Sequence, residues 1–432
     1  MSKSRVLFVF ATAILISCFV SSVFIQIAYS QNFVVPVTIA TYGNAWEGQL
    51  AFGLWNISAN GPTTGYLVIM TTSGALQYLR ESSDSSYIIV ENIAPDTIMF
   101  LGEPVLGGSN SGPLNPTHFW NYVSNTTVDF PQVVSHHDIV YNPFNNTFLT
   151  LQNYVRAING TDYLYDKIVE LTPTGNVLWS WDTFDYIPLS QADPFGPTAE
   201  VNGTTVQDFT HANALDWDYN NSIVYLNLRH TNTFYKINQT NSNLIWSCGE
   251  HGNFTLLSEN GTSVPSLWYH SHATRRVEPN VFIMLDNDFD NETNRNNCRS
   301  RMIEVTINEQ NMTAWVSWAW SAPKQYWTPF IGEVDRLPNG DRIGTFGSQT
   351  HQFPQNQPWD FNNTGAVLVE VNPAGNVTRT YTFPAGWGIY RIEEMNINVI
   401  PEFPKTRLVI ASVIIIGSVA AAIKLAFKKK IK

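Results

Sequence analysis

Three of the nine histidines fall at the same place in a repeated segment of the chain. They are His137, His211 and His272, and Glu333 takes this place in the last copy of the segment. A neutral imidazole is a good nucleophile near pH 7, and it can also carry a proton. Arg229, the next-to-last residue of the second copy, adds a guanidinium whose planar fork binds anions without ever losing its charge. Such a set suits the transfer of a group that spreads negative charge over its oxygens in the transition state.

Two of these histidines have close neighbours that are alternative candidates. His136 precedes His137, and on an extended strand their side chains would point to opposite faces, so that one of them is structural. His270 lies two residues before His272, shares its face on a strand, and is therefore a second candidate for the nucleophile. The repeat favours His137 and His272, and we place His136 and His270 among the substrate-binding residues.

Arg229 and Glu333 also allow other interpretations. Arg229 could pair with Asp216 or Asp218 instead of binding an anion. Three histidines and the carboxylate of Glu333 could bind zinc or iron, but the sequence lacks the short ligand spacing of a metal motif. Because Arg229 would repel a cation, we predict no metal in this site and assign Glu333 to substrate binding.

The candidate histidines lie in a chain whose sequence contains repeated hairpin patterns. One hairpin pattern, an alternating strand, a polar turn and a second strand, recurs at residues 65–79, 167–181, 234–248, 301–318 and 366–383. A second pattern recurs out of phase with the first, at residues 136–154, 210–230, 271–288 and 332–348, with a weaker copy at 91–103. Two hairpins per period make a four-stranded unit, and such units repeat radially in β-propellers. The sequence thus predicts an all-β propeller, in which residues 104–129 hold part of a further unit.

Three segments of this repeat resemble the bacterial arylsulfotransferase family. They are THANALDWDYNNSIVYLNLRHTNTFYKINQTNSNLIWSCGEHGNF at 210–254, SHHDIVYNP at 135–143 and SHATRRVEPNVFIMLDN at 271–287. The resemblance covers roughly residues 130 to 395, and it implies a six-bladed propeller whose active site lies in the central channel. It also implies transfer of a sulfuryl group from an aryl sulfate to a phenol, without a nucleotide sulfate donor.

The resemblance implies a role for each candidate residue. The histidine that becomes sulfurylated falls on His272, while His211, Arg229 and His137 fall on the sulfate-binding and acid–base positions. No cofactor is implied, although propeller channels can hold a structural calcium ion. Two other functions fit the same sequence: a cell-surface propeller that binds glycans or proteins without catalysis, and an aryl-sulfate hydrolase.

Both ends of the chain carry apolar segments that predict export and anchoring. Residues 1–30 have the basic start, apolar stretch and small residues of a signal peptide. Residues 408–427 follow a linker at 399–407 and are long and apolar enough for a transmembrane helix. The lysine-rich tail at 428–432 is expected in the cytoplasm. We therefore expect a single-pass cell-surface protein whose propeller, at 65–398, lies outside the cytoplasm, preceded by a small β module or the first strands at 31–64.

The remaining composition fits this location. A pair of cysteines, Cys248 and Cys298, lies outside the predicted signal, and an oxidising compartment predicts a disulfide between them. Many Asn-x-Ser/Thr motifs fit a glycosylated surface. The net charge of −11 excludes nucleic acid as an expected partner.

Overall fold

A computed structural model describes residues 33–56, 64–82, 86–103, 114–289, 298–347 and 365–395. These residues form strands β1 to β28, joined by turns and a few short 3-10 helices. Among them no helix has the length and apolar character that a membrane span requires. The predicted signal peptide, linker, transmembrane helix and basic tail all lie outside the described residues.

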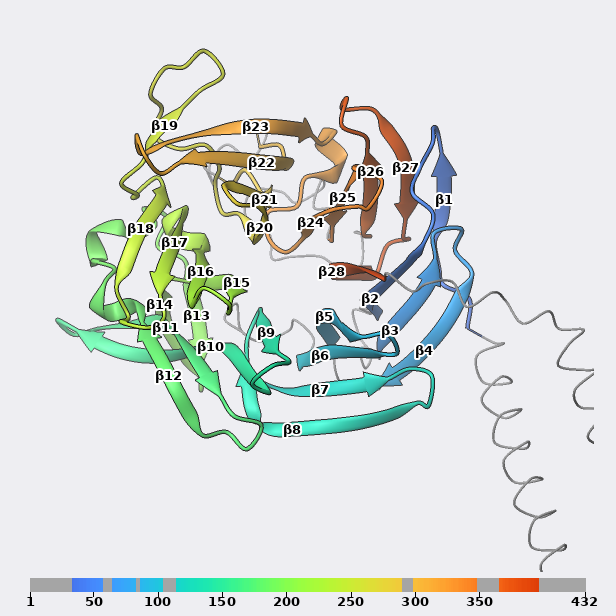
Figure 1. The fold of residues 1–432 in the computed structure, drawn as a ribbon, viewed down its shortest axis with the longest axis horizontal. Coiled ribbons are helices and arrows are strands. Elements are labelled where there is room, and N and C mark those ends of the chain that lie inside the picture. The colour runs from blue at the N-terminus through green and yellow to red at the C-terminus, as the bar shows by residue number, and fades with distance from the viewer. Residues whose placement is uncertain are drawn as a thin grey trace, which may run out of the picture. The chain divides into compact units, whose positions relative to one another are not determined.

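The strands of the described residues group into six sheets, numbered here along the chain (Figure 1). In spatial order, the first sheet holds β28 (Trp387–Met395), β2 (Gln49–Asn56), β3 (Thr64–Thr71) and β4 (Leu76–Ser82). The second holds β5 (Ser86–Ala94), β6 (Thr97–Glu103), β7 (Asn115–Asn121) and β8 (Thr126–Ser135). The third holds β13 (Thr198–Val201), β14 (Thr204–Asp208), β11 (Thr161–Leu171), β10 (Thr147–Ile158) and β9 (Ile139–Asn142), with β12 (Val177–Asp182) also paired to β11.

The other three sheets repeat this plan. The fourth holds β15 (Ala212–Asp218), β16 (Ile223–Leu228), β17 (Thr233–Asn238) and β18 (Leu244–Gly249). The fifth holds β19 (Thr255–Leu257), β23 (Thr313–Ser321), β22 (Arg301–Asn308), β21 (Val281–Asp286) and β20 (His272–Glu278). The sixth holds β1 (Thr38–Thr41), β27 (Val377–Thr382), β26 (Val367–Val371), β25 (Arg342–Phe346) and β24 (Glu333–Arg336).

Each sheet contacts the next one, and the sixth contacts the first. The contacts run from β2 to β5, from β8 to β10, from β9 to β15, from β15 to β20, from β21 to β24 and from β24 to β28. The early and late parts of the chain also share sheets, because β1 pairs with β27 and β2 pairs with β28. Residues 38–56 are therefore strands of larger sheets and do not form a separate module.

The predicted hairpins are confirmed by the strand pairing. The first pattern corresponds to β3–β4, β11–β12, β17–β18, β22–β23 and β26–β27. The second corresponds to β5–β6, β9–β10, β15–β16, β20–β21 and β24–β25. Strands β7 and β8, at residues 115–135, overlap the stretch 104–129 that was expected to hold part of a further unit, and they complete the second sheet beside β6.

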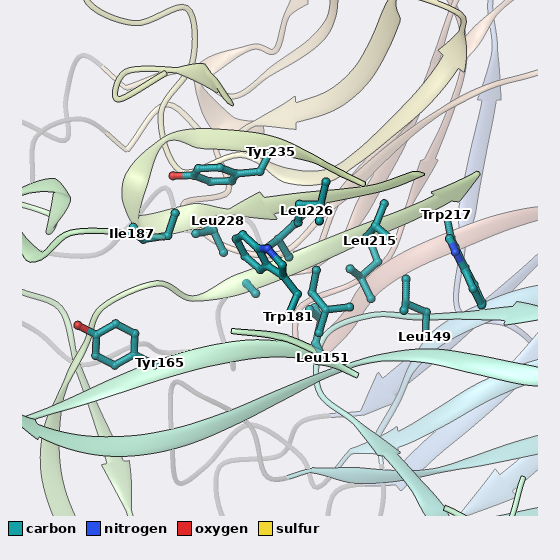
Figure 2. Packing of buried hydrophobic residues seen from close by; sticks show 14 of the residues in the cluster. Leu149, Leu151, Tyr165, Trp181, Ile187, Leu215, Trp217, Leu226, Leu228 and Tyr235 are labelled. Atoms are coloured by element: carbon teal, nitrogen blue, oxygen red, sulfur yellow. The ribbon is translucent and has the colours of Figure 1, made fainter. Parts of the chain in front are cut away.

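Large apolar side chains fill the space between neighbouring sheets. Between the third and fourth sheets, Leu151 and Trp181 pack with Leu215 and Leu226 in one buried cluster (Figure 2). Burying a side chain of this size stabilises the fold by about 1.5–3 kcal/mol. This packing fixes β15 against the third sheet, and with it the residues that precede β15 and β9.

The predicted disulfide between Cys248 and Cys298 is wrong, because neither cysteine is part of a disulfide. Cys248 packs in an apolar cluster with Phe234 and Trp268, whereas Cys298 packs in a different one with Phe289 and Trp327. Burial raises the pKa of the Cys248 thiol, which therefore stays protonated. Each cysteine acts as a small buried apolar side chain in its own cluster.

Candidate functional site

The candidate histidines lie where the chain turns into the inner strands of the third, fourth and fifth sheets. His137 and His211 have φ angles of 56° and 48°, and His270 has a φ of 56°. Residues other than glycine seldom adopt this left-handed region, and those that do are common in functional sites. The expectation that His136 and His137 point to opposite faces is wrong, because His137 is not extended. Their Nδ1 atoms instead lie 2.7 Å apart.

A series of ring contacts joins the histidines from separate sheets. The ring centroids of His137 and His211 lie 4.9 Å apart, and those of His211 and His230 lie 4.5 Å apart. Tyr390 of β28 lies between the other pair, 6.3 Å from the ring of His137 and 6.2 Å from that of His272. His230 is not among the candidates from the sequence, and the structure brings it into the group.

Arg229 completes the group from the short 3-10 helix η3 (Arg229–Thr231). Its Nη1 donates to His230 Nε2 at 2.6 Å, and its Nη2 donates to the carbonyl of Pro329 at 3.0 Å. Two residues further on, the amide of Ile331 donates to His272 Nε2 at 3.2 Å. A continuous set of contacts thus connects His272 with Tyr390, with the other histidines and with Arg229.

Arg229 does not take part in the alternative ion pairs considered from the sequence. Asp218 pairs with Arg276 at 2.9 Å, and Asp216 accepts the main-chain N–H of Arg276 at 2.7 Å. The guanidinium of Arg229, which is 9% exposed, lies among histidines instead. It is therefore placed to attract an anion.

Asn287 fixes which nitrogen of His272 carries the proton. The amide nitrogen of Asn287 donates to the carbonyls of Thr328 and Ile331, at 2.7 and 3.0 Å, so its oxygen must face His272. His272 Nδ1 donates to that oxygen at 2.7 Å, which leaves the lone pair on Nε2. Burial, and then the charge of Arg229, lower the pKa of His272 well below its ordinary value. The ring is therefore neutral near pH 7, with a nucleophilic nitrogen directed at the amide of Ile331.

Two aspartates support the other histidines. His211 Nδ1 lies 2.6 Å from Asp208 Oδ2, and His136 Nε2 lies 2.9 Å from Asp166 Oδ1. Because His136 also contacts His137, a line of polar atoms runs from Asp166 through His136 to His137. Asp208 thus contacts His211 directly, whereas Asp166 is connected to His137 through His136.

The environment of Asp166 keeps it ionised. Burial alone would raise the pKa of Asp166, but hydrogen bonds from His136, Thr210 and the amide of Ala212 outweigh burial and lower it. The Thr210 hydroxyl and the Ala212 amide donate to Asp166 at 2.6 and 2.7 Å. The pKa of His137 is also lowered, well below its ordinary value, by burial and by the neighbouring His211 and His136, and for a histidine this favours the neutral ring.

His270 and Glu333 lie close to the group but are engaged elsewhere. Both ring nitrogens of His270 have partners: Nδ1 lies 2.5 Å from the carbonyl of Phe289 and Nε2 lies 2.6 Å from Asp193. Glu333 forms an ion pair with Arg275 at 3.0 Å and accepts the amide of Ile392 at 3.0 Å. Both ring nitrogens of His272 are also engaged, but its Nε2 keeps its lone pair and accepts a main-chain N–H, whereas Nε2 of His270 lies against a carboxylate.

Asp208, His211 and His230 also have the spacing of metal ligands, with potential ligand atoms within 4.8 Å of one another. Their hydrogen bonds do not favour a cation. His230 Nδ1 donates to the carbonyl of Asp208 at 2.8 Å, and its Nε2 accepts from Arg229. A metal at His230 Nε2 would have to displace a guanidinium that carries the same sign of charge.

Comparison with known proteins gave one family. The model of the family described as arylsulfotransferase (ASST) matches residues 109–388. No curated protein sequence matches the chain. Among solved structures, a luciferin-regenerating enzyme is 12% identical with a TM-score of 0.39, covering 84% of this chain and 100% of its own.

Two further solved structures have similar scores. A putative 6-phosphogluconolactonase from Bacteroides uniformis is 8% identical with a TM-score of 0.40, covering 78% of this chain and 83% of its own. A hypothetical selenium-binding protein from Sulfolobus tokodaii is 11% identical with a TM-score of 0.38, covering 80% of this chain and 83% of its own. Such scores support no conclusion, whereas the family match spans most of the described sheets and both inner strands that follow His137 and His211. The chain belongs to the arylsulfotransferase family.

Proposed function

We propose that the protein transfers a sulfuryl group from an aryl sulfate to a phenol through a sulfurylated His272. The observation that carries the proposal is the tautomer of His272, whose Nδ1 donates to Asn287 and whose Nε2 keeps its lone pair, with the charge of Arg229 lowering its pKa. The six sheets, which contact one another in cyclic order, would be the blades of a six-bladed propeller. The predicted terminal segments would hold this propeller outside the cytoplasm, at the cell surface.

In the first half of the reaction, His272 Nε2 attacks the sulfur of the aryl sulfate. A nitrogen–sulfur bond forms, and the bond from sulfur to the aryl oxygen breaks with its electron pair on that oxygen. His211 gives the departing phenolate a proton, because Asp208 at its Nδ1 stabilises the protonated ring before transfer. The products are a phenol and the sulfurylated His272.

In the second half, an acceptor phenol takes the sulfuryl group from His272. Neutral His137 removes the proton of the phenol, whose oxygen attacks sulfur while the nitrogen–sulfur bond returns its electron pair to Nε2. The proton then passes from His137 to His211, whose ring centroids lie 4.9 Å apart, and the site is reset. No electrons are exchanged with a cofactor in either half.

Arg229 stabilises the negative charge that spreads over the sulfuryl oxygens in both halves. Its guanidinium is buried and fixed by His230 and the carbonyl of Pro329, so it needs little reorganisation when the charge develops. The amide of Ile331, which donates to His272 Nε2 in the resting site, must release that nitrogen when the substrate binds.

An assay with a chromogenic aryl sulfate separates this function from its rivals. We expect phenol release by the purified protein to depend on an added acceptor phenol and to yield the sulfated acceptor. Release that is independent of the acceptor would identify a hydrolase. No release with any phenol, from a protein whose thermal unfolding is cooperative, would favour a non-catalytic binding protein.

Replacing Asn287, which accepts the hydrogen bond from His272 Nδ1, tests whether this contact selects the tautomer of His272. We expect Asn287→Leu, which has a similar volume, to lower the transfer rate by about 10- to 100-fold, the range seen for partners that orient metal-bound histidines. The Nδ1 proton would lose its acceptor, and Nε2 would carry a proton in part of the molecules. The measurement is kcat with saturating donor and acceptor. An unchanged kcat would show that Asn287 does not select the tautomer.

The two aspartates should affect different halves of the reaction. We expect Asp208→Asn to slow the burst of phenol released without acceptor, because His211 loses the carboxylate that supports its proton. We expect Asp166→Asn to leave this burst nearly unchanged and to slow transfer to the acceptor. General acid–base groups typically contribute about 100- to 10,000-fold, and loss of a supporting carboxylate should remove part of this factor. Stopped-flow measurement of both halves checks the split, and equal slowing of both halves in both variants would contradict it.

A further inference from the structure

A pocket lies along the inner strands that follow the candidate histidines. It has a volume of about 380 Å³ and is lined by residues of β5, β9, β15 and β20, among them Tyr141, Trp217 and Arg275. His211 directly precedes β15 and Trp217 lies near its end. The lining begins at Asp138, which follows His137, but it includes none of the candidate histidines and not Arg229.

Aromatic rings form one side of this pocket. Trp217 and Tyr219 both line it, and their ring centroids lie 5.9 Å apart at 86°. Phe144 lies 5.6 Å from Tyr219 and is 78% exposed, an unusual exposure for a phenylalanine with ring neighbours. The indole of Trp217 is held in place, since its Nε1 donates to Gln239 at 3.0 Å. Trp217 and Tyr219, which line the pocket, are called its aromatic rim below, and Phe144 lies beside Tyr219.

Carboxylates and guanidiniums line the rest of the pocket, but the guanidiniums are already paired. Arg275 forms its ion pair with Glu333 at 3.0 Å, and Arg276 pairs with Asp218 at 2.9 Å. Glu91 and Asp216 also line the pocket. The carboxylates of Glu333 and Asp218 therefore balance the charges of Arg275 and Arg276. The carboxylates of Glu91 and Asp216 then give the pocket a net negative charge.

Glu91 is a carboxyl group of this lining whose pKa is raised mainly by burial. Burial raises the pKa of Glu91 to about 7, and the nearby carboxylates of Asp138 and Asp216 add to the rise, while Arg275 opposes it. Asp216 has the same direction of shift, because burial raises its pKa above the ordinary value. A positively charged ligand would relieve the repulsion between these carboxylates.

We propose that this pocket binds an organic ammonium ion between the aromatic rim and the carboxylates of Glu91 and Asp216. Aromatic rings beside carboxylates are the usual means by which proteins recognise quaternary and primary ammonium groups. The volume is that of an organic molecule and far exceeds that of a bare cation. Bidentate or converging carboxylates, which a metal ion prefers, are replaced here by carboxylates from separate strands, β5 and β15.

Choline and its uncharged isostere, 3,3-dimethylbutan-1-ol, provide a matched pair of probes. Isothermal titration calorimetry would measure their binding to the whole protein. We expect choline to bind and the isostere not to bind. We expect Tyr219→Leu and Glu91→Gln each to weaken choline binding by about tenfold or more, because each removes one partner of the cation.

Two control variants complete the experiment. Tyr42→Leu changes a tyrosine that is 68% exposed and lies outside the pocket, and it should leave choline binding unchanged. His272→Ala should also leave it unchanged, which keeps this test independent of the proposed sulfuryl transfer. Equal binding of choline and its isostere, or no choline binding by a folded protein, would overturn the proposal. So would binding of Ca²⁺ in the pocket that excludes choline, or unchanged binding in both pocket variants.

Discussion

His272→Ala is expected to abolish sulfuryl transfer and to leave the fold intact. The substitution removes the only atom that the mechanism bonds to sulfur, so the loss should exceed the roughly 100- to 1,000-fold cost of removing a single stabilising donor. The side chain is buried but polar, and it holds one hydrogen bond to Asn287 and one from Ile331. We therefore expect the midpoint of thermal unfolding to change much less than the rate. Phenol release from an aryl sulfate, with and without acceptor, measures the activity.

A second histidine variant serves as the matched control. His118 also forms a histidine–aspartate pair, with Asp129 at 2.7 Å, but it belongs to β7 in the second sheet, outside the candidate site. His118→Ala should keep full activity. If His272→Ala retained more than a small fraction of the wild-type rate, or if both variants lost activity equally, His272 could not be the nucleophile.

Arg229→Ala is expected to lower kcat/KM by about 100- to 1,000-fold, because the sulfuryl oxygens lose their fixed positive partner. Arg229→Lys should recover part of this loss, since it keeps the charge and loses the planar fork. The wild type and both variants would be compared with the same donor and acceptor. A lysine variant as slow as the alanine variant would show that geometry matters more than charge, and a fully active alanine variant would contradict the role of Arg229.

The pH dependence should change together with the rate. Arg229 is the largest cause after burial that lowers the pKa of His272. In the wild type, His272 therefore stays neutral and nucleophilic when the pH falls below 6.5. In Arg229→Ala the pKa of His272 rises toward its ordinary value, so protonation removes the lone pair and the rate falls on the acid side. Profiles of kcat/KM between roughly pH 5 and 8 test this, and superimposable profiles would contradict it.

The repeat in the sequence was sufficient to predict the hairpins and to select three of the site residues. Hairpins depend on local alternation and turn residues, which a sequence shows directly. Equivalent positions in repeated units lie at equivalent places in space, which is why His137, His211 and His272 reach one region although they are far apart in the chain. Arg229 was expected from the family resemblance, and the structure places it against His230.

The partners of these residues could not be predicted in the same way. His230 joins the group because the chain turns through η3 at the end of β16, and Asn287 does so because it follows β21 beside the loop of Ile331. Nothing in the spacing of polar residues marks either turn. The same limit explains the error about His136 and His137, since a positive φ at a histidine has no sequence signal as clear as glycine.

Charge pairing and cysteine pairing depend on contacts that are equally remote in sequence. Glu333 holds the repeat position that was expected, but Arg275 from the neighbouring sheet pairs with its carboxylate. Cys248 and Cys298 are an even pair in number, yet each lies in its own apolar cluster. A sequence shows the types of the residues and their spacing along the chain. The partners of Glu333 and of the two cysteines depend instead on which sheets lie side by side.

Mass spectrometry of the protein quenched during turnover tests the central claim most directly. The protein would be mixed with an aryl sulfate in the absence of acceptor, quenched in alkali, digested and sequenced. We predict that the peptide containing His272 gains the mass of one SO₃ group, and that an acceptor phenol added before the quench removes it. A burst of phenol without any modified histidine, or with the added mass on another residue, would contradict the account.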